Sequence, residues 1–258
     1  MPDLRATRLS KRFSGIRVVN DVNLTIRPGE IVGYLGPNGS GKTTTARMLA
    51  GLLEPSGGFV EYDGVDIRGD VVAFRRHLGY VPEEPYLYPF LSGREYLQLV
   101  GRLRELPEKL LTDKIDGFLR LFNLSVAADQ SIGSYSKGMR QKIVISAALM
   151  HDPDVVIFDE PETGLDVTTT MMLRHLVRTL AGRGKAILYS SHILEVVEKV
   201  CDRILVLHKG DVVADDSIER LRALLSSSNL EGVFAQLVIR DDPEQLAKDL
   251  ANLSAMSA

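Results

Sequence analysis

The stretch "GPNGSGKTT", residues 36–44, decides the fold of this chain. It follows the apolar run "EIVGYLG" (30–36) and leads into "TTTARMLAGLL" (43–53), which reads as a helix. The pattern Gly-x-x-x-x-Gly-Lys-[Ser/Thr] between a strand and a helix is typical of loops that bind phosphate groups. Glycines let backbone N–H groups converge on phosphate oxygens, and the N-terminus of the helix adds a favourable dipole.

Lysine and threonine side chains complete the chemistry of this stretch. Lys42 supplies a positive charge for the β- and γ-phosphates of a nucleotide, and the Thr43 hydroxyl group can ligate Mg²⁺. A glycine-rich turn with an incidental lysine is the alternative. The nucleotide-binding residues predicted here are Gly36, Pro37, Asn38, Gly39, Ser40, Gly41, Lys42, Thr43 and Thr44.

Two further apolar runs end in side chains that could act on a bound nucleotide. Asp159 and Glu160 follow the run 155–158, so the first acid can hold Mg²⁺ and the second can face an attacking water. His192 ends the run 185–192 after two serines, and a contact to the γ-phosphate is predicted for it. The alternatives are acids that merely finish a strand and a histidine satisfied by local hydrogen bonds.

Short apolar runs of this kind recur at 30–36, 154–160, 185–192 and 203–210. Runs of this length suit strands buried on both faces, which predicts an α/β fold with a mostly parallel sheet covered by helices. Ligands bind such sheets beyond the carboxyl ends of the strands. The alternating patterns at 3–10, 17–27 and 57–67 predict a separate set of antiparallel strands.

Residues 84–150 change in character and are predicted to form a helical insertion. Ser92 to Glu95 has the Ser-x-x-Glu form of a capping box, and leucine-rich helical patterning covers about 94–124 and resumes after 139. The tail from residue 226 predicts a short polar link, a strand and one amphipathic helix.

Composition narrows the class of protein. The 258 residues are 45% apolar and 25% charged, which is ordinary for a folded globular chain, and the net charge of -3 gives no reason to expect nucleic acid as a partner. A single cysteine, Cys201, fits a reducing compartment. The N-terminus predicts no secretory signal, and no apolar run approaches the roughly 18 residues that span a bilayer.

The motifs together resemble those of the ATPase subunits of ATP-binding cassette (ABC) transporters. The resemblance covers residues 4 to about 220 and includes "SYSKGMRQK" (134–142), "DEPETGLD" (159–166) and "SSH" (190–192), in the order of that family. It implies a P-loop NTPase with a RecA-like core, an antiparallel β-subdomain and a helical subdomain at about 84–150. It places the ABC ATPase domain at residues 1–225 and a short C-terminal extension at 226–258.

The resemblance also implies a second half-site for ATP. Ser136, Lys137 and Gly138 stand in the family's signature, usually Leu-Ser-Gly-Gly-Gln, which closes on ATP held by a second copy in a head-to-tail dimer. Ser136 can cap a helix that begins near Met139, and a plain capped helix is the alternative. Phe13 matches the aromatic residue that stacks on adenine, with a place in the β-subdomain core as its alternative.

The stretch "GYVPEEP" (79–85) resembles the family's Q-loop, with Glu83 in place of the usual glutamine. A carboxylate there can bind Mg²⁺ or water but cannot donate a hydrogen bond to phosphate. Glu84 is predicted to be solvated only. The side chains of 86–90 predict an apolar patch that receives a helix of a transmembrane permease, with packing on the chain's own helices as the alternative.

The predicted function is ATP binding and hydrolysis with Mg²⁺ in an exporter of the drug, antibiotic or Na⁺ efflux kind. The subunit is expected at the cytoplasmic face of the cell membrane, held there by the permease. One alternative is a soluble ABC-type ATPase of translation or DNA repair. Another is an interaction protein with an inactive nucleotide site, against which the complete set Lys42, Thr43, Asp159, Glu160 and His192 argues.

Overall fold

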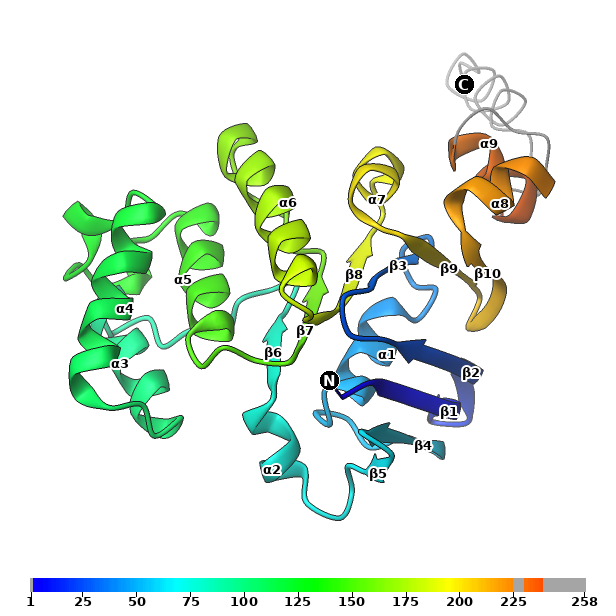
Figure 1. The fold of residues 1–258 in the computed structure, drawn as a ribbon, viewed down its shortest axis with the longest axis horizontal. Helices are drawn as coiled ribbons and strands as arrows, with labels where there is room; N and C mark the ends of the chain where they lie inside the picture. The colour runs from blue at the N-terminus through cyan, green and yellow to red at the C-terminus, as the bar shows by residue number, and fades with distance from the viewer. Residues whose placement is uncertain (1, 225–229, 239–258) are drawn as a thin grey trace, which may run out of the picture.

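A six-stranded sheet is the central element of the computed structural model, which describes residues 2–224 and 230–238 (Figure 1). Its strand order is β10-β9-β3-β8-β7-β6. The strands from β9 to β6 are parallel, and β10 pairs antiparallel at one edge. The predicted α/β class with a mostly parallel sheet is confirmed. The strands are β3 (Ile31–Leu35), β6 (Leu78–Val81), β7 (Val155–Asp159), β8 (Ala186–Ser191), β9 (Arg203–His208) and β10 (Asp211–Ser217).

The two faces of this sheet bury separate hydrophobic clusters, because successive side chains of a strand point to opposite faces. Ile31 and Leu35 of β3 lie in the cluster shared with the later helices, whereas Val32 and Tyr34 lie in the cluster shared with α1. The first face carries α5 (Lys137–Leu149), α6 (Val167–Gly182), α7 (Leu194–Val200), α8 (Ile218–Leu224) and α9 (Leu230–Val238), and the second carries α1 (Lys42–Leu49).

A four-stranded antiparallel sheet covers the outer side of α1 and forms the predicted β-subdomain. Leu4, Val60 and Met48 belong to one buried cluster, so the subdomain and α1 share a core. The sheet order is β2-β1-β4-β5, and all of its pairs are antiparallel. Its strands are β1 (Leu4–Phe13), β2 (Ile16–Ile26), β4 (Gly57–Tyr62) and β5 (Val65–Asp66).

The helical subdomain lies to one side of the sheet, as Figure 1 shows, and contains α3 (Gly93–Leu103), α4 (Glu108–Leu121), α5 and two 3₁₀ turns, η1 (Ser125–Ala127) and η2 (Ile132–Ser134). The capping box is confirmed: Ser92 Oγ accepts from the Glu95 backbone N–H at 3.2 Å, and Glu95 Oε2 accepts from the Ser92 N–H at 2.8 Å. The leucine-rich stretch forms two helices rather than one. Pro107 separates them because proline cannot continue a helix from within.

The structure differs from the sequence predictions at four places. The patterns above do not predict strand β6, whose run of four residues precedes the Q-loop, or the short helix α2 (Val71–Arg76) capped by Asp70. Helix α5 begins at Lys137, two residues before the predicted start, because Ser136 itself is the cap. The strand predicted in the tail is wrong for residues 230–238, which form α9. The amphipathic helix predicted beyond lies outside the described residues.

Helix α9 forms because its apolar side chains find a helical neighbour rather than a free sheet edge. Leu230 and Val238 are buried in the cluster that contains Val196 and Val200 of α7. Arg222 of α8 forms an ion pair with Glu198 of α7. The described part of the C-terminal extension therefore packs on the helix that follows His192.

His151 gives the fold a dependence on pH. Its Nε2 donates to the Leu78 carbonyl at 3.0 Å, whereas Nδ1 is buried and finds no partner among the described residues. Burial, and after it the charge of Arg104, lowers the pKa of this histidine from 6.5 to about 4. Protonation therefore favours the unfolded chain, and stability is lost as the pH falls from the unfolded pKa towards the folded one.

We expect the free energy of unfolding of His151→Gln to depend less on pH than that of the wild type. Glutamine can still donate to Leu78 but does not titrate. The wild type should lose about 1 kcal/mol between neutral pH and about pH 4 through this group, a figure reduced for the partial exposure of the ring. Urea unfolding across this range measures it. His175→Gln, at an exposed position, is the control, and an unchanged slope in His151→Gln would contradict the assignment.

Candidate nucleotide site

The glycine-rich stretch forms a loop between the end of β3 and the start of α1. Gly41 has a φ of 108° and ends the loop, so that α1 begins at Lys42 with its free N–H groups facing the loop. A Cβ on Gly36 would lie 2.4 Å from the Leu207 carbonyl oxygen. Only glycine permits this approach of the loop to β9. The strand–loop–helix arrangement predicted for a phosphate-binding loop is present.

Lys42 lies at the centre of the loop and is almost completely buried. Its Nζ donates to the Gly36 carbonyl at 2.7 Å and to the Pro37 carbonyl at 3.3 Å. It also lies 3.6 Å from Glu160 Oε1. Two carbonyls and one carboxylate thus hold the buried amino group at the loop, where the phosphates of a nucleotide would bind.

Glu160 joins the loop to His192. The carboxylate is buried, and its Oε2 lies 2.7 Å from His192 Nδ1 and 3.3 Å from the His192 backbone N. The Glu160 backbone has a φ of 49°, in the left-handed region that costs a glutamate energy. The turn directly after β7 aims the carboxylate at the end of β8. The structure thus brings together both residues that the sequence predicts as catalytic.

Asp159 is the last residue of β7 and is fully buried. Burial raises the pKa of this carboxyl group, the neighbouring Thr43 and Ser190 hydroxyl groups oppose the shift, and the charges of Glu83 and Glu160 add to it. Its Oδ1 is buried and receives no hydrogen bond from a described residue. Three carboxylates are therefore crowded at one end of the sheet, an arrangement that a cation would stabilise.

A cavity of about 270 Å³ opens in front of these groups. Its lining contains most of the predicted loop residues together with Glu83 and Glu160, and one residue that the sequence did not single out, Val18 of β2. Gly36, Pro37 and Ser40 do not line it. The Gly36 and Pro37 carbonyls accept from Lys42 Nζ, and Gly36 packs against Leu207 of β9. The loop residues that line it are Asn38, Gly39, Gly41, Lys42, Thr43 and Thr44.

Glu83 and Glu84 are consecutive residues of one loop but have different surroundings. Both are exposed, but Glu83 lines the cavity and Glu84 does not. Gln141, a buried residue of α5 that the sequence reasoning missed, donates to the Pro82 carbonyl at 3.5 Å and ties this loop to the signature helix. Its only signal in the sequence is its place just after the signature.

The signature residues lie apart from the cavity. Ser136 caps α5 by accepting from the Met139 N–H at 3.2 Å, and both Ser136 and Lys137 are exposed. A Cβ on Gly138 would lie 2.5 Å from the Gly164 carbonyl oxygen, so the turn packs on the loop after Glu160. Lys142 forms a 3.2 Å ion pair with Asp166 of the same loop. A second helix N-terminus is thus presented to solvent, away from the first.

Phe13 lies at the end of β1 and is 45% exposed, so it is not a core residue of the β-subdomain. Lys11 Nζ lies 5.2 Å from the centre of its ring. The ring does not line the cavity, although Val18 of the adjacent strand does. Stacking of Phe13 on adenine stays a prediction.

A phosphate-binding loop at the end of a central strand, with acids at the end of a parallel strand two places along the sheet, defines a P-loop nucleoside triphosphatase. Comparison with protein families places residues 19–163 in the ABC transporter family. The ABC transporter ATP-binding protein NatA of Bacillus subtilis (strain 168) is 39% identical over 239 residues, covering 91% of this chain and 97% of NatA. The Nod factor export ATP-binding protein I of Ralstonia nicotianae is 36% identical, covering 83% and 66%.

Solved structures agree with these relatives. The ATP-binding subunit of an ABC transporter superposes with a TM-score of 0.85 at 32% identity, covering 91% of this chain and 98% of that one. A dimeric ATP-binding cassette in a post-hydrolysis state with ADP and Pi shares the fold, with a TM-score of 0.76 at 24% identity and coverage of 83% and 98%.

The chain belongs to the ABC transporter ATP-binding family, and it binds and hydrolyses ATP as a subunit of such a transporter. The relatives do not support the alternative of a cassette ATPase in translation or DNA repair. Within residues 2–224 and 230–238, no helix is long and apolar enough to cross a membrane.

The contacts of Glu160 predict the result of Glu160→Gln. The amide keeps the shape of the side chain but cannot accept a proton, so ATP should bind with nearly unchanged affinity while hydrolysis falls about 10²–10⁴-fold. Single-turnover hydrolysis and binding of a fluorescent ATP analogue measure the two effects. Glu84→Gln is the control and should leave both unchanged, because Glu84 is exposed and does not line the cavity. Near wild-type hydrolysis in Glu160→Gln would rule out its role as a base.

Proposed function

We propose that the protein is the ATPase subunit of an exporter, with ATP bound between two copies of the chain. One observation carries the proposal: the catalytic cluster around Lys42 and the exposed signature turn at Ser136 belong to different surfaces of one subunit. A single chain therefore offers two half-sites that it cannot itself join. The relatives named for Nod factor export and the efflux character inferred from the sequence favour export as the direction.

Mg²⁺ fits the residues at the end of the sheet. Thr43, Asp159 and Glu83 offer oxygen ligands, the type that Mg²⁺ prefers, and Asp159 Oδ1 is buried without a hydrogen-bond donor from a described residue. Among the described residues, no group of three or more His, Cys, Asp or Glu side chains makes a metal site alone. The ion would therefore bind together with phosphate oxygens. When bound, it would neutralise charge on the phosphates.

The chain's own groups then have distinct roles. Lys42 would exchange the Gly36 and Pro37 carbonyls for phosphate oxygens, which are stronger acceptors because they are charged. Glu160 would take a proton from the attacking water, and the His192 ring at 2.7 Å holds that carboxylate in place. Ser136 of the second copy would present the N-terminus of α5 to the same phosphates.

A head-to-tail dimer predicts that two inactive variants rescue each other. Lys42→Ala removes the cation of one half-site, and Ser136→Arg blocks the other with a bulky side chain. In a mixed dimer, one of the two sites is built from intact halves. Random exchange should restore about a quarter of wild-type activity, since half of the dimers are mixed and one site in each works.

ATP hydrolysis by each variant alone and by their mixture measures this rescue. Subunit exchange is shown first with differently labelled wild-type chains. If the mixture is no more active than its components although exchange occurs, the two half-sites do not act across an interface.

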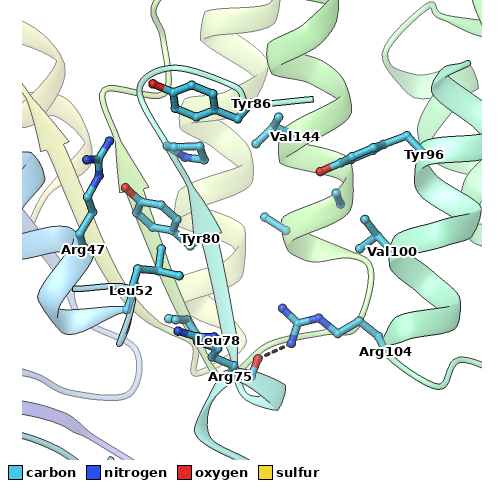
Figure 2. Close-up of a pocket in the computed structure, with 14 residues that line it drawn as sticks. Arg47, Leu52, Arg75, Leu78, Tyr80, Tyr86, Tyr96, Val100, Arg104 and Val144 are labelled. Carbon is cyan, nitrogen blue, oxygen red and sulfur yellow. Dashed lines mark hydrogen bonds between the residues drawn. The ribbon is translucent and has the colours of Figure 1, made fainter. Parts of the chain in front are cut away.

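The permease needs a docking surface, and a groove of about 650 Å³ fits that need. Figure 2 shows it between α1 and β6 on one side and α3 and α5 on the other. Tyr86, which directly follows the Q-loop, lines it and is 78% exposed. Tyr88 and Phe90 are also exposed, whereas Leu87 packs on the core, so most of the predicted apolar patch is accessible.

Charge narrows the chemistry of the segment that docks. Arg47, Arg75 and Arg104 line the groove, whose 14 residues include no acid. Burial and the charge of Arg75 lower the pKa of the Arg104 guanidinium, and Arg75 Nε is buried without a partner among the described residues. A carboxylate in an otherwise apolar helix would relieve both. We therefore propose that the permease inserts a short helix that carries an acidic side chain.

Arg104→Gln should weaken binding to the permease at least about tenfold, because a buried charge pair loses one partner. ATP binding by the isolated subunit should not change. The control is Arg102→Gln, which removes an exposed arginine paired with Glu108 on the outer side of α3. Co-purification with a co-expressed permease measures the effect. Equal binding by both variants would exclude the groove arginines as the docking site.

A further inference from the structure

Tyr80 connects the groove to the nucleotide site. It lies on β6 and lines the groove with its ring (Figure 2). Its hydroxyl oxygen lies 3.4 Å from Asp159 Oδ2. The positive charge of the Arg47 guanidinium on α1 acts on the same hydroxyl group and lowers its pKa, against the larger effect of burial. Arg47 is itself a lining residue of the groove and is exposed. Three elements of the core therefore meet at one phenol.

The chemistry of the groups sets the direction of the hydrogen bond to Asp159. An ionised carboxylate can only accept, so Tyr80 donates its own proton to Asp159. The positive charge of Arg47 polarises the hydroxyl group and strengthens its bond to the carboxylate.

We propose that Tyr80 is a positioning residue that holds the Asp159 carboxylate for Mg²⁺ and transmits to it whether the groove is occupied. The Oδ2 atom is restrained by Tyr80, while Oδ1 is buried without a donor among the described residues. The hydrogen bond thus leaves Oδ1 as the atom directed at a cation. Groups that orient a metal ligand typically contribute about 10- to 100-fold to metal affinity.

The transmission follows from the exposure of Arg47. An acidic side chain that enters the groove can pair with this guanidinium and draw it away from Tyr80. The phenol then loses the polarising charge, and its bond to Asp159 weakens. This last step rests on the proposed function, because it takes the docking segment to be acidic. The restraint of Asp159 by Tyr80 does not depend on it.

The test is binding of a fluorescent ATP analogue to the isolated subunit across a titration of Mg²⁺. Tyr80→Phe keeps the ring and removes the hydroxyl group. We expect it to raise the Mg²⁺ concentration for half-maximal binding about tenfold, and to leave affinity in EDTA unchanged because the loop contacts remain. The control is Tyr62→Phe. It removes a hydroxyl group of β4 that is hydrogen-bonded at 2.9 Å to Asp154, the residue before β7. It should shift neither quantity.

A second variant tests the influence of Arg47 on Tyr80. Arg47→Gln, at an exposed position, should raise the required Mg²⁺ concentration in the wild-type background and have no further effect in Tyr80→Phe. Additive effects of the two changes, or a Tyr80→Phe titration equal to wild type, would overturn the inference. So would an equal loss of affinity in EDTA, which would show a general packing role. These measurements use the isolated subunit without the permease, so their outcome does not depend on the result of the docking experiment.

Discussion

Parallel pairing of β3, β8 and β7 is the constraint on which the site depends. Leu35 pairs with Ser191, and Ser190 pairs with Asp159, so the three strands end at one level. The phosphate loop, His192 and Glu160 follow those ends directly. Lys42 of the loop forms an ion pair with Glu160 at 3.6 Å, and Glu160 is hydrogen-bonded to His192 at 2.7 Å. A slip of one residue in either pairing would turn these side chains to the opposite face of the sheet.

Concentrating charge at this edge has an electrostatic consequence. Burial gives Asp159, Glu160 and Lys42 a low-dielectric surrounding, in which repulsion between acids and attraction to the lysine are both strong. Burial, with a smaller contribution from the charges of Glu83 and Glu160, raises the pKa of Asp159. In the proposed dimer, phosphates, a cation and the closing helix of a second copy would each supply what the single chain lacks. Assembly of the site and binding of ATP would therefore be coupled.

The helical subdomain serves two surfaces at once. Its helix α5 begins at the exposed signature cap and continues along the groove, where Val144 and Ala148 are lining residues. Gln141 of the same helix contacts the Q-loop, and Lys142 contacts the loop after Glu160. A permease helix in the groove and a nucleotide in the dimer interface would therefore both contact α5. A shift of this helix would link transport to hydrolysis.

The sequence by itself determined the α/β class, the phosphate loop, the acids at 159 and 160 and the helical insertion, because each is encoded by local pattern or spacing. It missed β6, Tyr80, Gln141 and the arginines of the groove. Four apolar residues are too short a signal for a strand, and a tyrosine or arginine acquires its role only from partners far along the chain. The pairing of β6 with β7 decides that Tyr80 meets Asp159. Tertiary structure likewise turned the tail into α9, since α7 provides an apolar surface for a helix.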